Sequence, residues 1–166
     1  MTTPADRVDV VIVGGGMITH DQILPSIYHL QRIGRVGTIR VCALNSAPLR
    51  DLAEETRFEE AFPGQRFEPS PSLDTPPDAM HPDLFKEVIA SLAPHNLVVV
   101  AVPDHFHDAV IRVALEHDQH VLCVKPLVPT YAQSVEIERL ARAKGLLVGV
   151  EYHKRFDRRS LDGRRQ

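Results

Sequence analysis

The sequence predicts an α/β domain built on a doubly wound parallel sheet. Three observations lead to this prediction: five apolar runs of strand length recur along the 166 residues, the runs are unbroken rather than alternating, and segments with helical spacing separate them. Unbroken apolar runs are typical of strands that are buried on both faces of a sheet. Regular alternation of strand and helix places such strands in one parallel sheet with right-handed crossovers.

Six strands are expected in order along the chain. The five apolar runs lie at residues 8–13, 39–44, 97–102, 121–124 and 146–150. A short additional strand is expected at 65–68, within the stretch 63–82, which holds six prolines and is interpreted as an extended surface segment.

Helical spacing fills the segments between the strands. Apolar residues recur at intervals of three and four in three of these segments, at 49–56, 85–92 and 106–117. The last helix has Thr130 and Gln133 as a capping box and Gly145 as its C-terminal stop. Pro25 interrupts the first helical pattern, so this helix is either kinked there or restarts with Pro25 in its first turn.

Composition argues against several classes of protein. The chain is 43% hydrophobic and 25% charged with a net charge of −3, which suits one globular domain and disfavours a nucleic-acid or membrane-surface protein. Cys42 and Cys123 are too few and too far apart for a zinc site or a disulfide framework, and are expected to be reduced core residues of a cytoplasmic protein. No signal peptide or membrane span is expected, because no apolar run approaches the roughly 18 residues that a span requires.

A glycine-rich turn, GGGMIT at 14–19, follows the first strand. In a dinucleotide-binding fold, the first glycine makes the tight turn, the second lets the backbone approach the pyrophosphate, and the next helix offers free N–H groups to the phosphates. Thr19 stands at the third position of this pattern, so helix and strand either pack slightly farther apart or Thr19 caps a helix that begins late. The cofactor contacts expected at this turn are Gly14, Gly16, Met17 and Ile18.

The second predicted strand ends in Ala-Leu-Asn-Ser at 43–46. An Asp or Glu at this place would hold the adenosine ribose of NAD through its hydroxyls. Asn45 can still hydrogen-bond a ribose but does not repel a 2′-phosphate, and Arg50, one helical turn further on, is expected to face such a phosphate. Asn45 and Ser46 also suit the N-cap of the next helix, and capping is compatible with ribose binding. The cofactor is therefore expected to be NAD or NADP, with tolerance of NADP favoured over strict use of NAD.

The end of the fourth predicted strand provides further candidate cofactor contacts. Val102 is its last residue and is followed by Pro103, Asp104 and His107, beside the first strand, where doubly wound sheets form their ligand crevice. Asp104 also suits the N-cap of the following helix. No metal site is expected, because the histidines are scattered and no carboxylate or cysteine lies at ligand spacing from His105 and His107.

Lys125 and Pro126 close the fifth predicted strand, in the run VLCVKPLVP. A lysine at a strand end is common at a protein surface and requires no special cause. This lysine follows the strand that is expected to border the crevice. We therefore interpret Lys125 as a group at the edge of the cofactor.

Three of these motifs together resemble the Gfo/Idh/MocA family of oxidoreductases: GGGMI, VPDHFH and VLCVKPL, within a resemblance that covers about residues 8–156. The resemblance implies a Rossmann fold, NAD or NADP as cofactor, and a sugar- or polyol-like substrate. It implies that Pro103, Asp104 and His107 border the nicotinamide half of the cofactor, and that Lys125, beside Pro126, is a catalytic residue directed at the nicotinamide and the substrate. Val124 stands where the family has a glutamate.

Family members are usually much longer and have a second α/β domain that supplies groups for proton transfer. The resemblance thus implies an NAD(P)-binding domain over 1–150 and, at 151–166, the start of a linker toward a substrate domain that this chain lacks. On this interpretation the chain is a truncated oxidoreductase that is inactive alone. Two alternatives stay open: a non-catalytic dinucleotide-binding module that forms homo-oligomers, and a nucleoside-cofactor transferase such as a methyltransferase, against which the strand-four and strand-five motifs argue.

Overall fold

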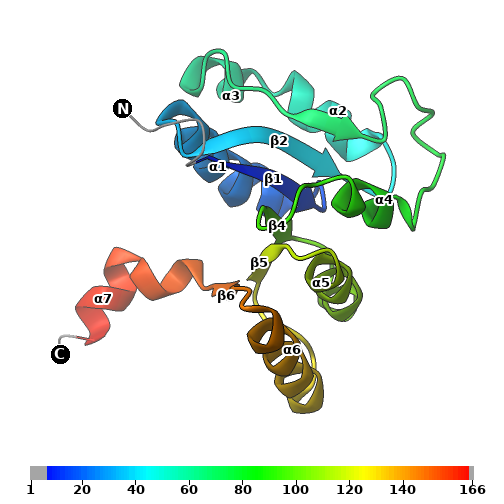
Figure 1. Cartoon of the computed structure of the whole chain (residues 1–166). Helices are drawn as coiled ribbons and strands as arrows, with labels where there is room; N and C mark the ends of the chain where they lie inside the picture. Colours follow the sequence, from blue (N-terminus) through cyan, green and yellow to red (C-terminus); the bar gives the residue numbers. More distant parts are fainter. Residues whose placement is uncertain (1–6, 165–166) are drawn as a thin grey trace.

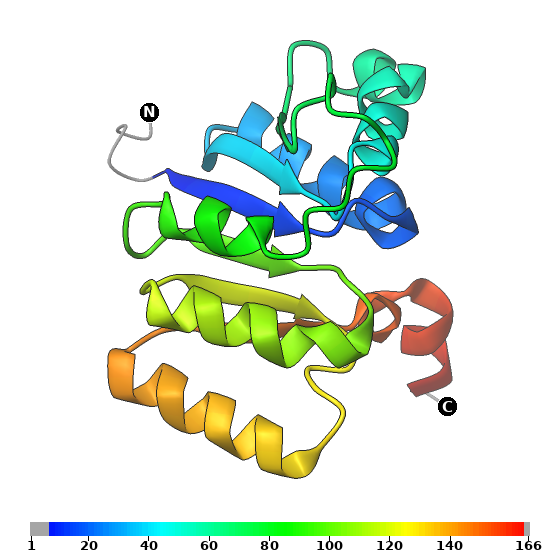
Figure 2. The ribbon, with the colours of Figure 1, turned by 90° about the vertical axis from the view of Figure 1, so that its right-hand side faces the viewer.

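The computed structural model describes residues 7–164 and contains one sheet of six parallel strands in the order β3-β2-β1-β4-β5-β6. The strands are β1 (Val8–Val13), β2 (Val36–Cys42), β3 (Glu68–Ser70), β4 (Leu97–Val100), β5 (His120–Val124) and β6 (Val148–Glu151). The chain leaves β1 toward β2 and returns to pair β4 against the other side of β1, so the sheet is doubly wound, as predicted. The arrowheads of β1, β2, β4 and β5 point to one edge of the sheet in Figure 2, and β3 and β6 pair parallel to their neighbours. The turns that follow the strands therefore gather at that edge.

Helices cover both faces of the sheet (Figure 1). One face is covered by α4 (Leu84–Ala90), α5 (His107–Glu116) and α6 (Tyr131–Lys144), and the other by α1 (Leu24–Arg32) and α2 (Ala47–Glu54). The shorter elements are η2 (Thr19–Ile23), α3 (Thr56–Ala61), η3 (Asp104–Phe106), η4 (His153–Phe156) and α7 (Arg158–Arg164).

Strand β1 contributes to the cores on both faces. Val11 and Val13 pack in the core beneath α4, α5 and α6, while Val10 and Ile12 pack in the core beneath α1 and α2. All four side chains are at most 4% exposed. This two-sided burial explains why the strand appears in the sequence as an unbroken apolar run.

The observed strands differ from the predicted ones mainly at their ends. β1 has the predicted bounds, whereas β2 begins three residues earlier than expected and ends at Cys42, so that residues 43–44 belong to the following loop. The short strand expected near 65–68 is present with shifted bounds, because the segment that pairs with β2 is Glu68–Ser70. Pro69 lies in this strand without an N–H to donate, which is tolerated because β3 forms the edge of the sheet.

The helical predictions hold with one exception. Pro25 lies in the first turn of α1, as the second alternative expected, but α1 continues directly from the π-helical turn η2, with Ile23 and Leu24 in helical backbone. The N-cap side chain of Thr130 accepts a hydrogen bond from the backbone N–H of Gln133, and Gly145 ends α6 with φ of 65°. The pattern at 49–56 is not one helix, because Glu55 takes extended backbone between α2 and α3 with ψ of 103°.

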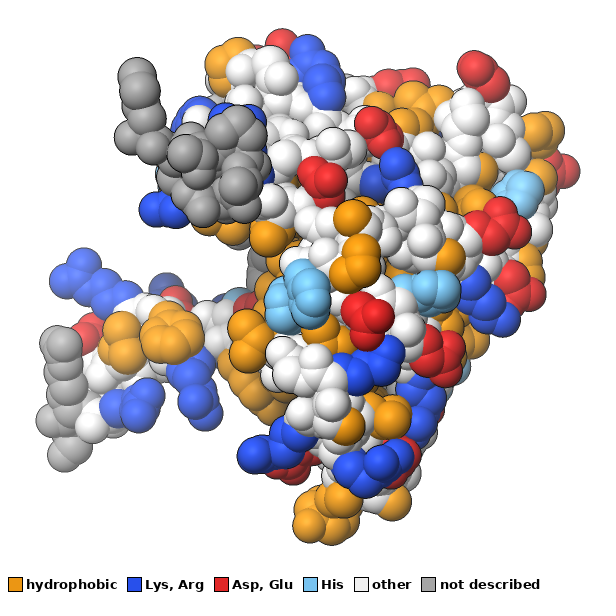
Figure 3. Space-filling model, in the orientation of Figure 1, with side chains coloured by type: hydrophobic (Ala, Val, Ile, Leu, Met, Phe, Trp, Pro, Cys, Tyr) orange, Lys and Arg blue, Asp and Glu red, His pale blue; other side chains and the backbone are white. Residues whose placement is uncertain are grey.

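After β6 the chain leaves the sheet as an arm made of η4 and α7. Figures 1 and 3 show this arm standing apart from the body, with basic side chains along it, and Phe156 within it is 77% exposed. No helix among residues 7–164 combines the length and the apolar character that crossing a bilayer requires. Residues 1–6 and 165–166, at the outer ends of the predicted segments 1–150 and 151–166, lie outside the described residues.

Candidate functional site

Gly14 lies where β1, β2 and β4 meet. Its N–H donates to the carbonyl of Cys42, the last residue of β2, at 2.7 Å. The N–H of Ala101, the residue that follows β4, donates to the carbonyl of Val13 at 2.8 Å. Gly14 has φ of +116°, and a Cβ built on it would lie 2.3 Å from the carbonyl oxygen of Ala101. No side chain fits at this position, so the first glycine is required by the close approach of the β1 turn to the end of β4.

The glycine turn is open to solvent after Gly15, which is itself half-buried. A Cβ on Gly16 would meet no atom within 4 Å, and Met17 is 78% exposed. The N–H groups of Gly15 and Gly16 donate to no backbone or side-chain acceptor within residues 7–164. Unpaired backbone donors ahead of a helix suit anionic oxygens. This turn therefore fits the phosphates of a dinucleotide.

Thr19 does not cap the helix, so that alternative was wrong. The N-cap residue is Ile18, which makes no capping hydrogen bond through its side chain. Thr19 is fully buried, and its Oγ1 donates to the carbonyl of Gly14 at 2.6 Å. The hydroxyl thus fixes the start of the helix against the turn, at the position where the dinucleotide-binding pattern has its third glycine.

A mainly apolar cleft of about 250 Å³ opens beside Gly14, between the ends of β1, β2 and β4 and the helices α4 and α5. Its walls are contributed by residues from five segments, among them Leu44, His81, Pro82, Phe85, Val102, Pro103 and Ala109. Narrow apolar clefts with a few polar groups at the rim are suited to flat ring systems. A purine base next to the phosphate turn is such a ring.

The proline-rich segment at 71–82 forms part of the cleft wall and is fastened by residues that follow β2. Ser46 is fully buried, and its hydroxyl donates to the carbonyl of Thr75 at 2.6 Å. Arg50 donates through Nε to Leu73 at 2.8 Å and through Nη2 to Thr75 at 2.9 Å. Two donor groups of Arg50 are therefore engaged with backbone carbonyls.

Asn45, rather than Ser46, caps α2. The Oδ1 of Asn45 accepts a hydrogen bond from the N–H of Ala47 at 3.1 Å, whereas Ser46 makes no capping bond through its side chain. The prediction that Ser46 caps this helix was wrong, because its hydroxyl turns to the segment at 71–82. Asn45 is only partly buried and remains beside the rim of the cleft.

The residues that follow β4 separate into exposed and buried positions. Pro103 and Asp104 are exposed. Asp104 opens η3 and makes no capping bond, so its predicted role as an N-cap was wrong. His107 is 1% exposed and is not part of the cleft wall; its two ring nitrogens lie 2.8 Å from the carbonyl oxygens of Val102 and Pro126.

Lys125 and Pro126 are exposed directly after β5, at the edge of the sheet that carries the glycine turn. Val124 is 8% exposed and belongs to the core beneath α1. Glu151 is in register with Val124 on the neighbouring strand β6. Paired residues of adjacent strands are about 5 Å apart and face the same side of the sheet. Glu151 therefore places a carboxylate at this edge of the sheet, one strand away from the end of β5.

Glu151 and His153 form a pair that was not predicted from the sequence. The Oε2 of Glu151 lies 3.3 Å from Nδ1 of His153, and the Glu151 side chain is 19% exposed. The sequence signal that could have indicated Glu151 is that it is an acidic residue at the end of a strand: it is the last residue of β6, as Val124 is the last residue of β5.

Both cysteines are poor candidates for nucleophiles. Burial raises the pKa of the Cys42 thiol and of the Cys123 thiol to about 12 in each case. A thiol with such a pKa is protonated near neutral pH and does not attack an electrophile readily.

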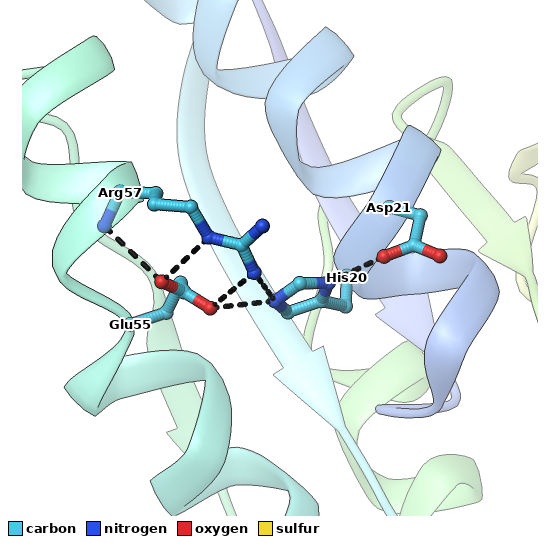
Figure 4. A network of polar contacts seen from close by, with 4 residues as sticks. All are labelled: His20, Asp21, Glu55 and Arg57. Atoms are coloured by element: carbon cyan, nitrogen blue, oxygen red, sulfur yellow. Dashed lines mark hydrogen bonds and ion pairs between the residues drawn. The ribbon is translucent and has the colours of Figure 1, made fainter.

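A network of four polar side chains joins the helix after the glycine turn to the junction between α2 and α3 (Figure 4). His20 lies 2.6 Å from Asp21 and 2.9 Å from Glu55, and Glu55 also accepts from Arg57 at 2.7 Å. Hydrogen bonds to Asp21 and then to Glu55 raise the pKa of His20 above its ordinary value of 6.5. The bond from Arg57, followed by that from His20, holds the pKa of Glu55 far below its ordinary range.

Comparison with known proteins identifies the class of this site. Residues 8–152 match the oxidoreductase family GFO_IDH_MocA, NAD-binding Rossmann fold, and the chain belongs to this family. It is therefore an NAD(P)-binding Rossmann domain of Gfo/Idh/MocA oxidoreductases, as the resemblance of the motifs predicted.

Individual relatives match this chain over only part of their own length. Over 71 residues, 42% of this chain and 21% of the relative, it is 44% identical to inositol 2-dehydrogenase 1 of Saccharopolyspora erythraea. The structure of biliverdin reductase from Synechocystis in complex with biliverdin and NADP+ is 27% identical with a TM-score of 0.58, and 87% of this chain covers 37% of it. The WlbA dehydrogenase from Chromobacterium violaceum, in complex with NADH and UDP-GlcNAcA, is 18% identical with a TM-score of 0.69, and 98% of this chain covers 40% of it. The chain thus spans about two fifths of the length of these solved structures.

The His20 network predicts a stability that depends on pH. The pKa of His20 is raised in the folded state, so the network adds to the free energy of unfolding. This stabilisation is fully present below about pH 6.5 and is lost as the pH rises through the pKa of His20 in the folded state. Urea unfolding of wild type and His20→Gln should therefore differ more in free energy at about pH 5.5 than at about pH 8.5. An Asp21→Asn background removes the largest cause of the shift and should reduce the difference, whereas equal differences at both pH values would contradict this account.

Proposed function

We propose that this chain binds NAD(H) or NADP(H) across the edge of the sheet where the strands end. The adenine lies in the apolar cleft, the phosphates lie over the N–H groups of Gly15 and Gly16, and the nicotinamide extends toward Lys125. The observation that supports this arrangement best is the cleft that opens directly beside the unpaired donors of the glycine turn. The order of the strands supports the direction, because β2 and β5 lie on opposite sides of the β1–β4 pair.

We further propose that the chain is the cofactor-holding part of an oxidoreductase for a sugar- or polyol-like substrate. A bound nicotinamide supplies the hydride donor or acceptor for interconversion of a carbinol and a carbonyl group. Lys125 provides a positive charge at that end of the site and orients the substrate oxygen. Glu151 and His153 add a carboxylate and an imidazole one strand away, which are groups suited to moving a proton. The inositol 2-dehydrogenase relative and the sugar-nucleotide complex of WlbA support this substrate class, while biliverdin reductase shows that the family fold also serves other substrates.

For the choice of cofactor, we propose weak discrimination between NAD and NADP. Asn45 is neutral and neither repels nor attracts a 2′-phosphate. Arg50, the cation expected to face such a phosphate, already donates to Leu73 and Thr75. Its role is better described as holding the cleft wall, and the dissociation constants of the two cofactors are expected to agree within about tenfold.

The Ala109→Phe variant tests the proposed site. Ala109 is an exposed residue of α5 on the cleft wall, so a phenyl ring there fills the place assigned to adenine without entering the core. In NADH fluorescence titrations, the dissociation constant should rise at least about tenfold, or about 1.4 kcal/mol. Ala132→Phe, on the exposed side of α6 and outside the cleft, is the matched control and should bind as wild type does. Binding by Ala109→Phe within about twofold of wild type would refute the adenine position.

The Arg50→Ala variant separates the two roles considered for this arginine. If Arg50 holds the cleft wall, its loss loosens the segment at 71–82 and weakens NADH and NADPH by the same factor. If Arg50 contacts a 2′-phosphate, NADPH alone loses about tenfold or more in affinity. We expect an unchanged ratio of the two dissociation constants, with Arg66→Ala, which removes an exposed cation paired with Glu59, as the control for net charge.

A further inference from the structure

His107 is one of four polar side chains among residues 7–164 that are buried in the protein, and it is the one with an ionisable ring. It is the first residue of α5, at the sheet edge where β4 and β5 end. Its 1% exposure prevents the ring from touching a cofactor in the cleft. A buried imidazole requires hydrogen-bond partners, so its contacts show what it holds.

The carbonyl partners of His107 come from two different loops, and a further partner, the Sγ of Cys123 in β5, lies 3.3 Å from Nδ1. Nε2 lies 2.8 Å from the carbonyl oxygen of Val102, in the loop after β4. Nδ1 lies 2.8 Å from the carbonyl oxygen of Pro126 and 3.2 Å from that of Leu127, in the loop after β5. Carbonyl oxygens only accept hydrogen bonds, so a neutral ring donates to one of the two loops, and donation to both loops requires a proton on each ring nitrogen. We call this set of contacts the His107 bridge.

The His107 bridge bears directly on Lys125, which precedes Pro126 in the chain. Lys125 is exposed, and the residue before it, Val124, is directed into the core and provides no carboxylate to hold the ammonium group. The peptide group whose oxygen faces Nδ1 is therefore one residue from the backbone that carries the Lys125 side chain. A hydrogen bond that holds the Pro126 peptide group to the loop after β4 therefore also restrains the Cα of Lys125, from which the side chain extends.

We propose that His107 is a positioning residue: through the carbonyls of Val102 and Pro126, it holds the loop that presents Lys125 to the nicotinamide end of the cofactor. This inference rests on the proposed function for the place of the nicotinamide, but the bridge itself does not depend on it. The carbonyl of Val102 is the one group of the cleft wall to which His107 is hydrogen-bonded among the described residues, so loss of His107 should leave most of the adenine cleft and the phosphate turn in place.

The test measures how well bound NADH protects the Lys125 amine from trinitrophenylation by trinitrobenzenesulfonate, in which the amine displaces sulfite from the aromatic ring. The modification is read by peptide mass spectrometry on the full chain. In wild type, NADH at about ten times its dissociation constant should slow modification of Lys125 about tenfold, because only the free fraction reacts. ADP-ribose, which lacks the nicotinamide, should leave Lys125 reactive. In His107→Leu, NADH should still bind within about threefold of wild type by titration, but its protection of Lys125 should be lost.

Two further variants distinguish positioning from general loss of stability. Ile111→Ala removes a fully buried side chain from the same helix, so it should lower stability and keep the protection of Lys125. His107→Gln retains one amide donor and should recover part of the protection. Full protection in His107→Leu, or equal loss in Ile111→Ala, would overturn the inference.

Wild type also gives an independent signature of the bridge. An imidazole N–H that donates to a buried carbonyl should appear in proton NMR as a resonance of His107 that exchanges slowly with solvent. Absence of that resonance would overturn the bridge even if neither His107 variant folds. If wild type shows the resonance but binds no NADH, the proposed function fails while the bridge stands.

Discussion

The close approach of the β1 turn to the end of β4 is the constraint on which the rest of this structure depends. A Cβ on Gly14 would lie 2.3 Å from the carbonyl oxygen of Ala101, so the two strands can approach in this way only with glycine there. That approach sets where the chain turns into η2, where the N–H groups of Gly15 and Gly16 are directed, and where the apolar cleft opens. The Thr19 hydroxyl bound to the Gly14 carbonyl then holds the helix against the turn.

Around this junction, several side chains connect neighbouring loops by hydrogen bonds. Ser46 and Arg50 hold the proline-rich segment that forms a wall of the cleft, and His20 joins the helix after the glycine turn to Glu55. His107 joins the loops after β4 and β5. The edge of the sheet is thus a set of loops held to one another by hydrogen bonds to backbone carbonyls and by one charged network. A dinucleotide would meet a surface that is already arranged for it, which reduces the ordering that binding requires.

The sequence predicted the sheet well because buried parallel strands have a direct signal in composition. β1 has the predicted bounds, and Pro25 and Gly145 mark helix ends by backbone geometry alone. The errors arose where tertiary hydrogen bonds decide the outcome. The Ser46 hydroxyl, expected to cap a helix, donates instead to the carbonyl of Thr75, 29 residues away in the chain, a contact that no local sequence pattern indicates. Glu151 was missed because its importance depends on strand register.

The most direct test of this account is amide chemical-shift mapping of the ¹⁵N-labelled chain with added NADH. If the Gly14 junction builds the cofactor site, the amides of Gly15, Gly16 and Met17 shift together with those of the cleft wall and of Lys125, and all follow one binding curve. Shifts confined to the arm formed by η4 and α7, with the glycine turn unchanged, would contradict the central claim.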